Sequence, residues 1–86
     1  MEIDEFKWLM AELSLLKNEY KYLETIYGTY DAHHFCYIVC FNCNFCGEFF
    51  TIPVSIAEDY VIDMRTIENI KSAFLYYYNS YEKYFT

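Results

Sequence analysis

Residues 3–27 read IDEFKWLMAELSLLKNEYKYLETIY, and this stretch decides how the rest of the chain has to be arranged. Its apolar residues recur at steps of three and four, which is the spacing of one buried face of an α-helix. The residues of this inner stripe are Phe6, Leu9, Leu13, Leu16, Tyr20, Leu23 and Tyr27. The spacing predicts one long helix from Ile3 to Tyr27, ending at Gly28, a residue suited to a helix C-cap.

A second apolar stripe runs along another side of the same predicted helix, rotated by about 200° from the first. This outer stripe comprises Trp8, Ala11, Leu15, Asn18 and Tyr22. If other parts of the chain covered only the inner stripe, Trp8, Leu15 and Tyr22 would stay in water. We therefore expect them to bind a target or a second copy in a homodimer, together with the neighbouring acids Glu12 and Glu19. Burial against the rest of the chain is the alternative.

A two-residue period follows, which is typical of β-strands. Residues alternate from Phe35 to Phe41 and from Phe49 to Ile56, and the intervening NCNFCG (residues 42–47) favours a turn. The pattern predicts an antiparallel hairpin. Its second strand should lie at a sheet edge, because Pro53 cannot donate a backbone hydrogen bond.

A second long helix is predicted to start around Asp63 or Thr66, because apolar residues again step by three and four. Its seam comprises Ile67, Ile70, Phe74, Tyr77, Tyr81 and Tyr84, widened by Tyr78 and Phe85. Leu75 and Tyr76 lie off this seam on a polar face and form a second candidate contact surface.

These elements predict a single α+β domain over residues 1–86, with a long N-terminal helix, a β-hairpin and a long C-terminal helix. The alternative is a helical hairpin in which the cysteine-containing region forms a metal-stabilised loop.

The four cysteines raise the question of a metal site. Cys43 and Cys46, followed by Gly47, look like a zinc knuckle, but tetrahedral zinc needs two more ligands. Cys36 and Cys40 are candidates, yet on an extended strand they would lie about 13 Å apart, too far to share one ion. Zinc therefore requires a region that is not a plain strand, or two knuckles from two chains. Otherwise the cysteines are buried thiols and turn residues.

The net charge of −7, from 13 acidic and 6 basic residues, argues against direct binding to nucleic acid or an anionic membrane. No run approaches the roughly 20 apolar residues of a membrane span, and the N-terminus does not resemble a secretory signal. We therefore expect a cytoplasmic protein with reduced cysteines.

The sequence contains no Gly-rich phosphate loop, Gly-x-Ser-x-Gly elbow or His-Glu-x-x-His motif. His33 and His34 have no recognisable acid and nucleophile partners, so we expect no enzyme activity. Aromatic residues make up 23% of the chain, more than a small core needs, which favours an exposed contact surface. An AT-rich genome would also explain this composition.

In size, acidity and aromatic content the chain resembles inhibitors encoded by bacteriophages and mobile elements, such as anti-CRISPR and anti-restriction proteins. The resemblance is one of class and implies a protein target in the host cytosol, such as a nucleic-acid-binding defence enzyme, with no cofactor. DNA mimicry is disfavoured, because Glu5, Glu12 and Glu19 would be spaced by about 10.5 Å. We expect recognition through an aromatic patch with acids at its periphery.

Overall fold

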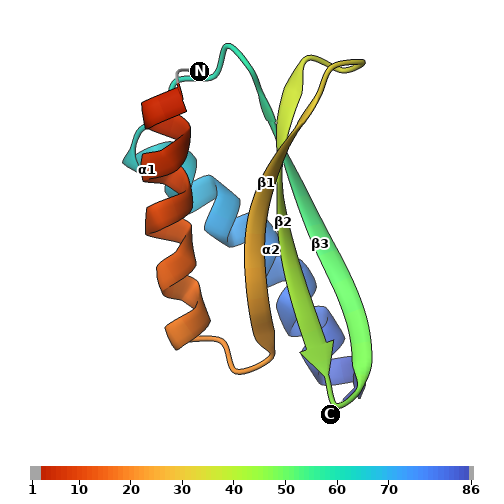
Figure 1. Cartoon of the computed structure of the whole chain (residues 1–86). Helices are drawn as coiled ribbons and strands as arrows, with labels where there is room; N and C mark the ends of the chain where they lie inside the picture. Colours follow the sequence, from red (N-terminus) through yellow and green to blue (C-terminus); the bar gives the residue numbers. More distant parts are fainter. Residues whose placement is uncertain (1–2, 86) are drawn as a thin grey trace.

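The computed structural model describes residues 3–85, which form two helices and a three-stranded antiparallel sheet (Figure 1). In chain order the elements are helix α1 (Ile3–Ser14), a 3₁₀ turn η1 (Leu15–Asn18), strands β1 (Leu23–Asp31), β2 (Cys36–Phe45) and β3 (Glu48–Ala57), and helix α2 (Met64–Phe85). The α+β class predicted from the sequence is confirmed. The alternative, a helical hairpin with a metal-stabilised loop, is wrong.

The first helix is shorter than predicted. It ends at Ser14, whose hydroxyl donates to the Ala11 carbonyl oxygen at 2.7 Å, and the chain continues through η1 into β1. The prediction of a helix to Tyr27 is therefore wrong. Residues 23–31 are rich in Thr, Tyr and Ile, which favour strands. Their pairing with β2 overrides a helical spacing that Leu23 and Tyr27 share with the preceding residues.

The predicted hairpin is the β2–β3 pair, to which β1 adds a third strand. Phe45 pairs with Glu48 around a two-residue loop in which Cys46 and Gly47 have φ angles of 56° and 98°. Left-handed residues at both positions suit the twist of a tight hairpin. The Asn44 side-chain oxygen accepts the Gly47 N–H at 2.8 Å and holds this turn.

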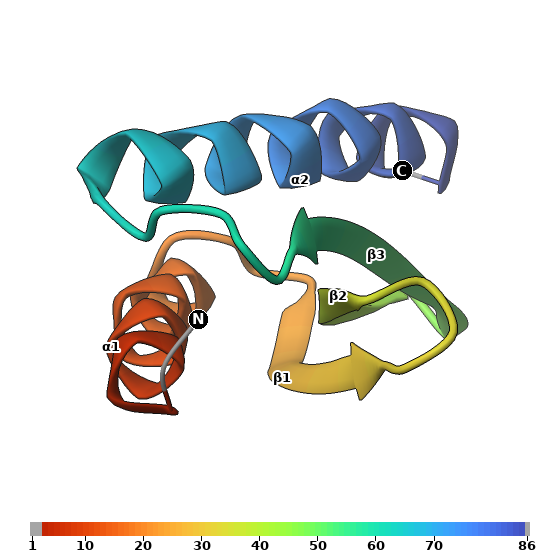
Figure 2. The same ribbon diagram turned by 90° about the horizontal axis from the view of Figure 1, so that it is seen from above.

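Both helices lie against the same face of the sheet (Figure 2). Alternate residues of β2, namely Val39, Phe41, Cys43 and Phe45, point into the core from this face. The helices meet them with Leu9, Leu13, Ile67, Ile70, Phe74 and Tyr78. The result is a two-layer molecule, with one sheet and one layer of helices, that measures 38 × 26 × 17 Å.

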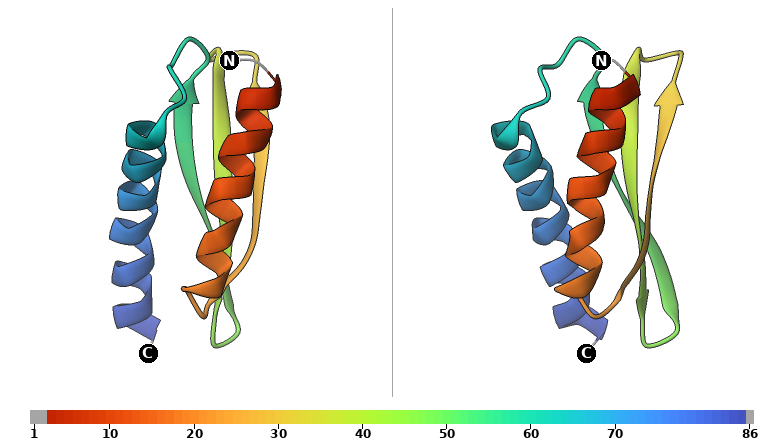
Figure 3. Two further views of the ribbon diagram at one scale, coloured as in Figure 1. Left: turned by 90° about the vertical axis from the view of Figure 1, so that its left-hand side faces the viewer. Right: turned by 60° about the vertical axis from the view of Figure 1, so that its left-hand side comes forward.

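Helix α1 lies along β1, whereas α2 lies along β3 and β2 (Figure 3). The close approach of α1 depends on Gly28, which we had expected to cap a helix. A Cβ atom at this position would lie 2.2 Å from Cζ of Phe6. Gly28 is therefore a strand residue that leaves room for an aromatic ring on the sheet.

Helix α2 buries Ile67, Ile70 and Phe74, which form the first part of its predicted seam. In the C-terminal half of the helix, the buried residue differs from those of the predicted seam itself. Tyr78 is buried, and its hydroxyl oxygen accepts the Tyr22 N–H at 3.1 Å. Tyr77 and Tyr84, which we had placed on the seam, are exposed.

Candidate interaction surface

The face of the sheet that points away from the helices is uncovered. Within residues 3–85, no helix or strand lies against it (Figures 1 and 2). Its residues alternate with the core-facing ones along each strand. This open face comprises Thr25, Tyr27, Thr29, Asp31, Cys36, Ile38, Cys40, Asn42, Asn44, Phe49, Thr51, Pro53, Ser55 and Ala57. Asp31, at one end of β1, is the member of this set that is charged at neutral pH.

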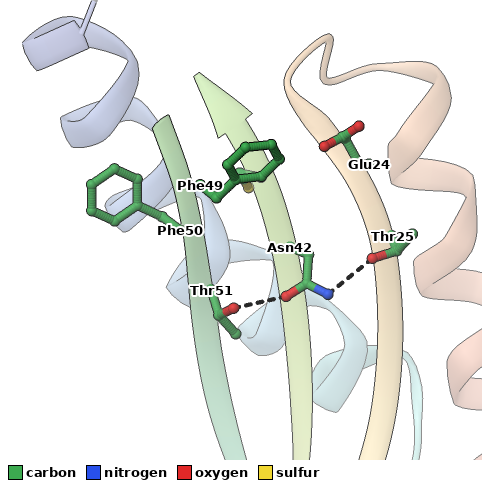
Figure 4. A pocket seen from close by; sticks show the side chains of 7 residues that line it. Glu24, Thr25, Asn42, Phe49, Phe50 and Thr51 are labelled. Carbon is green, nitrogen blue, oxygen red and sulfur yellow. Dashed lines mark hydrogen bonds between the residues drawn. The ribbon is translucent and has the colours of Figure 1, made fainter. Parts of the chain in front are cut away.

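A polar bridge crosses all three strands of this face, on the side of the β2–β3 turn. The Asn42 side chain donates to the Thr25 hydroxyl at 3.0 Å and accepts from the Thr51 hydroxyl at 2.8 Å (Figure 4). The bridge forms the floor of a shallow hollow of about 390 Å³, with Glu24 and Phe49 at its sides. The side chains of the floor are thus held in fixed positions.

Exposed rings flank the bridge. Tyr27 on β1 has 47% of its surface exposed, and Phe49 on β3 has 73%. A hydrogen bond with Cys40 raises the pKa of the Tyr27 hydroxyl, which places Tyr27 beside the thiol of the neighbouring strand. The open face therefore combines aromatic area with hydroxyl and amide groups and carries little charge.

The two histidines lie in the β1–β2 loop and are engaged by Asp31. One Asp31 carboxylate oxygen accepts the backbone N–H groups of His33 and His34 at 3.0 and 3.3 Å. The other oxygen lies 2.7 Å from Nδ1 of His34, and this contact holds the pKa of Asp31 below its usual value. These contacts are those of an Asx-type turn, so they give the histidines a structural role.

The outer stripe does not form one line, because α1 ends before it does. Trp8 lies on α1, Leu15 lies in η1 with 59% of its surface exposed, and Tyr22 lies just before β1. Tyr22 is half-buried, with its ring centroid 5.3 Å from that of Phe45. The structure therefore separates Tyr22, which packs on the core, from the two exposed residues.

The predicted acidic row is divided in the same way. Glu5 and Glu12 lie on α1, whereas Glu19 lies beyond η1. The regular spacing that a continuous helix would give them is absent.

The second candidate contact pair is also divided. Leu75 packs against the core, and Tyr76 is 71% exposed with its ring 5.2 Å from that of Tyr77. The two residues do not form one patch.

The cysteines lie in four different environments. Cys36 is half-buried at the start of β2, Cys40 faces the open side, Cys43 faces the core, and Cys46 is exposed in the turn. Burial raises the pKa of the Cys43 thiol to about 11, which disfavours the thiolate that zinc requires.

In the part of the chain that the structure describes, no three His, Cys, Asp or Glu residues are placed to hold a metal ion. The extended strand separates Cys36 from Cys40, as the spacing argument anticipated. Zinc binding through Cys43 and Cys46, including sharing between two chains, stays a prediction.

The open face was missed in the sequence because the strand from Phe35 to Phe41 is apolar on both sides, which we read as a strand covered on both faces. Polar residues later in the sequence indicated that one face of the sheet is uncovered. Asn42, Thr51 and Ser55 share one face by their spacing, and this face would have read as the uncovered side of an antiparallel sheet.

A scan of protein-family models found no match to this chain, and searches of curated proteins and of solved structures also found none. Among the described residues, no helix is long and apolar enough to cross a membrane.

Proposed function

We propose that this chain is a small protein-binding module that carries out no chemistry of its own and inhibits its target by covering a functional surface. The observation that carries the proposal is the open face of the sheet. It is a broad surface with two exposed rings, Tyr27 and Phe49, around a fixed polar bridge. Tyrosine and phenylalanine are enriched where proteins bind one another, and a pre-organised surface loses less entropy on binding.

The negative net charge of the chain supports a target with a basic surface. The chain has a net charge of −7, but the acids at the open face are Asp31 and, beside the hollow, Glu24, so most of the negative charge lies elsewhere on the molecule. Such an arrangement steers the protein toward a basic partner without burying unpaired charges at the centre of the interface. A nucleic-acid-binding defence enzyme has a surface of this kind, in keeping with the class resemblance to anti-CRISPR and anti-restriction inhibitors.

The proposal is tested by capturing partners from cells that naturally express the gene and comparing two double variants. Tyr27→Ala with Phe49→Ala removes both rings of the open face, whereas Trp8→Ala with Leu15→Ala removes the exposed part of the outer stripe. All four side chains are exposed, so both variants should stay folded by circular dichroism. A partner should be lost with the first variant and kept with the second.

The same partner, once purified, should bind the wild-type chain in isothermal titration calorimetry and should lose at least about tenfold in affinity to the open-face variant. Its own activity should fall when the wild-type chain is added. If the outer-stripe variant alone loses the partner, the interface lies on α1 and η1 instead. A partner that binds both variants equally would show that neither surface is the docking site.

A further inference from the structure

A groove runs along the free edge of β3, separate from the centre of the open face. Strand β3 ends the sheet order β1-β2-β3, so within residues 3–85 its outer edge has no strand partner. Helix α2 runs beside this edge over most of its length (Figure 3). Three hollows follow one another between the two elements, and together we call them the edge groove.

Residues of β3 line all three hollows, and aromatic residues of α2 complete two of them. The middle hollow, of about 220 Å³, is lined by Thr51, Ile52, Pro53, Tyr77 and Tyr81. Toward the C-terminus of α2, a hollow of about 330 Å³ lies between Phe50 and the residues Ser80, Tyr81, Tyr84 and Phe85. At the other end, a hollow of about 280 Å³ lies between residues 54–57 and Tyr60, Thr66, Asn69 and Ile70.

The backbone of β3 presents hydrogen-bonding groups to this groove. The Glu58 N–H donates to the Phe35 carbonyl oxygen at 3.2 Å, one step beyond the Ala57–Cys36 pair, so Glu58 belongs to the set that faces β2. In an antiparallel ladder such residues alternate with residues whose N–H and C=O groups face the other way. Residues 49, 51, 55 and 57 therefore point these groups to the free edge.

Pro53 belongs to the edge-facing set and has no N–H, so it removes one donor near the middle of the strand. The groove thus offers donors in two groups, at residues 49 and 51 and at residues 55 and 57. A strand that paired here would lose one hydrogen bond at Pro53, and at the end of β3 the Ala57 carbonyl oxygen already accepts the Tyr60 N–H at 3.0 Å.

The lining of the edge groove is uncharged at neutral pH. All residues around the three hollows are apolar, aromatic, hydroxyl or amide residues, although the chain has a net charge of −7. The groove therefore suits apolar side chains. The overall charge favours a ligand with basic flanks.

We propose that the edge groove binds an extended peptide segment of a partner protein, which adds to β3 as a fourth strand. Side chains of a strand alternate between two sides, so every second residue of the peptide would enter the groove and the others would point to solvent. A segment of about ten residues, or roughly 33 Å, spans the length of β3. The expected sequence has apolar residues at alternate positions and Lys or Arg at its ends.

A second copy of this chain fits the groove less well than a peptide. Antiparallel pairing of two β3 strands about their centres would bring both Pro53 residues together and would remove two donors. It would also unite two molecules that each carry a net charge of −7.

The test begins with a phage-displayed library of random dodecapeptides selected on the full-length protein. The most enriched peptide is synthesised, and its Kd is measured by fluorescence anisotropy. We expect alternate apolar positions in the selected peptides, and backbone amide shifts along residues 49–57 on titration. A library that yields no peptide above background would overturn the proposal.

Two tyrosines provide matched variants for this peptide. Tyr77 lines the middle hollow and Tyr27 lies on the open face, and each has 47% of its surface exposed. Tyr77→Ala should weaken the peptide about tenfold, while Tyr27→Ala should leave its Kd unchanged. Loss with Tyr27→Ala alone would place the peptide on the open face and reject the edge groove.

Strand addition is distinguished from general apolar binding by N-methylation of the peptide, which leaves the protein unaltered. Two isomeric peptides carry N-methyl groups at alternate positions, in opposite registers. The isomer whose methyl groups face β3 should bind at least about tenfold more weakly, because its donors are gone, and the other should bind like the parent. Equal affinity of the two isomers would refute strand addition. This outcome is separate from partner capture by the open face, so either proposal can fail alone.

Discussion

Gly28 shows how one residue determines the distance between a helix and the sheet. The ring of Phe6 occupies the space that a side chain at residue 28 would need, and it also packs on Tyr37 with a centroid distance of 4.9 Å. An ordinary Gly→Ala change in a strand reduces the entropy of the unfolded chain and tends to stabilise. At Gly28, the contact with Phe6 reverses this expectation.

We expect Gly28→Ala to lower the free energy of unfolding by about 1–3 kcal/mol, because a Cβ atom forces Phe6 to move. Urea denaturation followed by circular dichroism measures this change. The same substitution in a Phe6→Ala background should cost much less, since the clashing ring is gone. An unchanged urea midpoint for Gly28→Ala would show that α1 does not approach the sheet so closely.

At the scale of elements, α2 is set in place at its N-terminus by Asp63. One carboxylate oxygen of Asp63 accepts the Thr66 N–H at 3.0 Å and the Thr66 hydroxyl at 3.2 Å. The Thr66 hydroxyl also lies 2.6 Å from the Val61 carbonyl oxygen, which joins the preceding loop to the helix. These contacts make Asp63 the N-cap residue and confirm the predicted start of this helix.

Asp63→Ala should lower the Tm by several degrees at neutral pH, because the first turn of α2 loses its cap. The backbone N–H of Thr66 lowers the pKa of Asp63 from its usual 3.8. The stabilising effect of the carboxylate is therefore present above pH 3.8 and is lost as the pH falls through the lower folded-state pKa.

The difference in Tm between wild type and Asp63→Ala should accordingly shrink below about pH 4. Asp59→Ala is the matched control, since it removes the same charge from the same loop without touching the first turn of α2. Thermal melts at pH 7 and pH 3 compare the three proteins. Equal melting of Asp63→Ala and Asp59→Ala at pH 7 would contradict the capping role.

At the scale of the whole molecule, the division of the outer stripe decides which residues stabilise the fold and which remain for partners. A single layer of helices covers one face of the sheet, so Tyr22 is held between β1, Phe45 and α2, while Trp8 and Leu15 stay exposed. Tyr22→Ala should lower the free energy of unfolding by about 2–3 kcal/mol, since it removes a half-buried ring.

Leu15→Ala should change the free energy of unfolding by less than about 0.5 kcal/mol and serves as the control. Circular dichroism melts measure both variants, and light scattering records self-association alongside. If the exposed residues mediate a homodimer, Trp8→Ala with Leu15→Ala abolishes it while the protein stays folded. If the Tyr22→Ala protein melts like wild type, Tyr22 does not stabilise the fold, and the prediction that it belongs to the contact surface stands.

The sequence by itself determined the elements whose patterns are local. The β2–β3 hairpin follows from alternation and a turn with Gly47, and the edge position of β3 follows from Pro53, which lacks a donor. The beginnings of both helices follow from three-and-four spacing. In each case neighbouring residues carry the necessary information, because the pattern matches one periodic structure and its end signals.

Only the tertiary structure decided whether residues 23–31 form a helix or a strand. The surfaces that depend on these residues were decided with them. Leu23 and Tyr27 continue a helical spacing, but Thr25, Ile26 and Thr29 favour a strand, so local pattern alone supports both states. Pairing with β2 resolves the conflict through backbone hydrogen bonds to residues up to 20 positions away in sequence. That pairing ends α1 early, divides the outer stripe and completes the open face. Such contacts form only when distant segments meet, so the spacing of apolar residues could not reveal them.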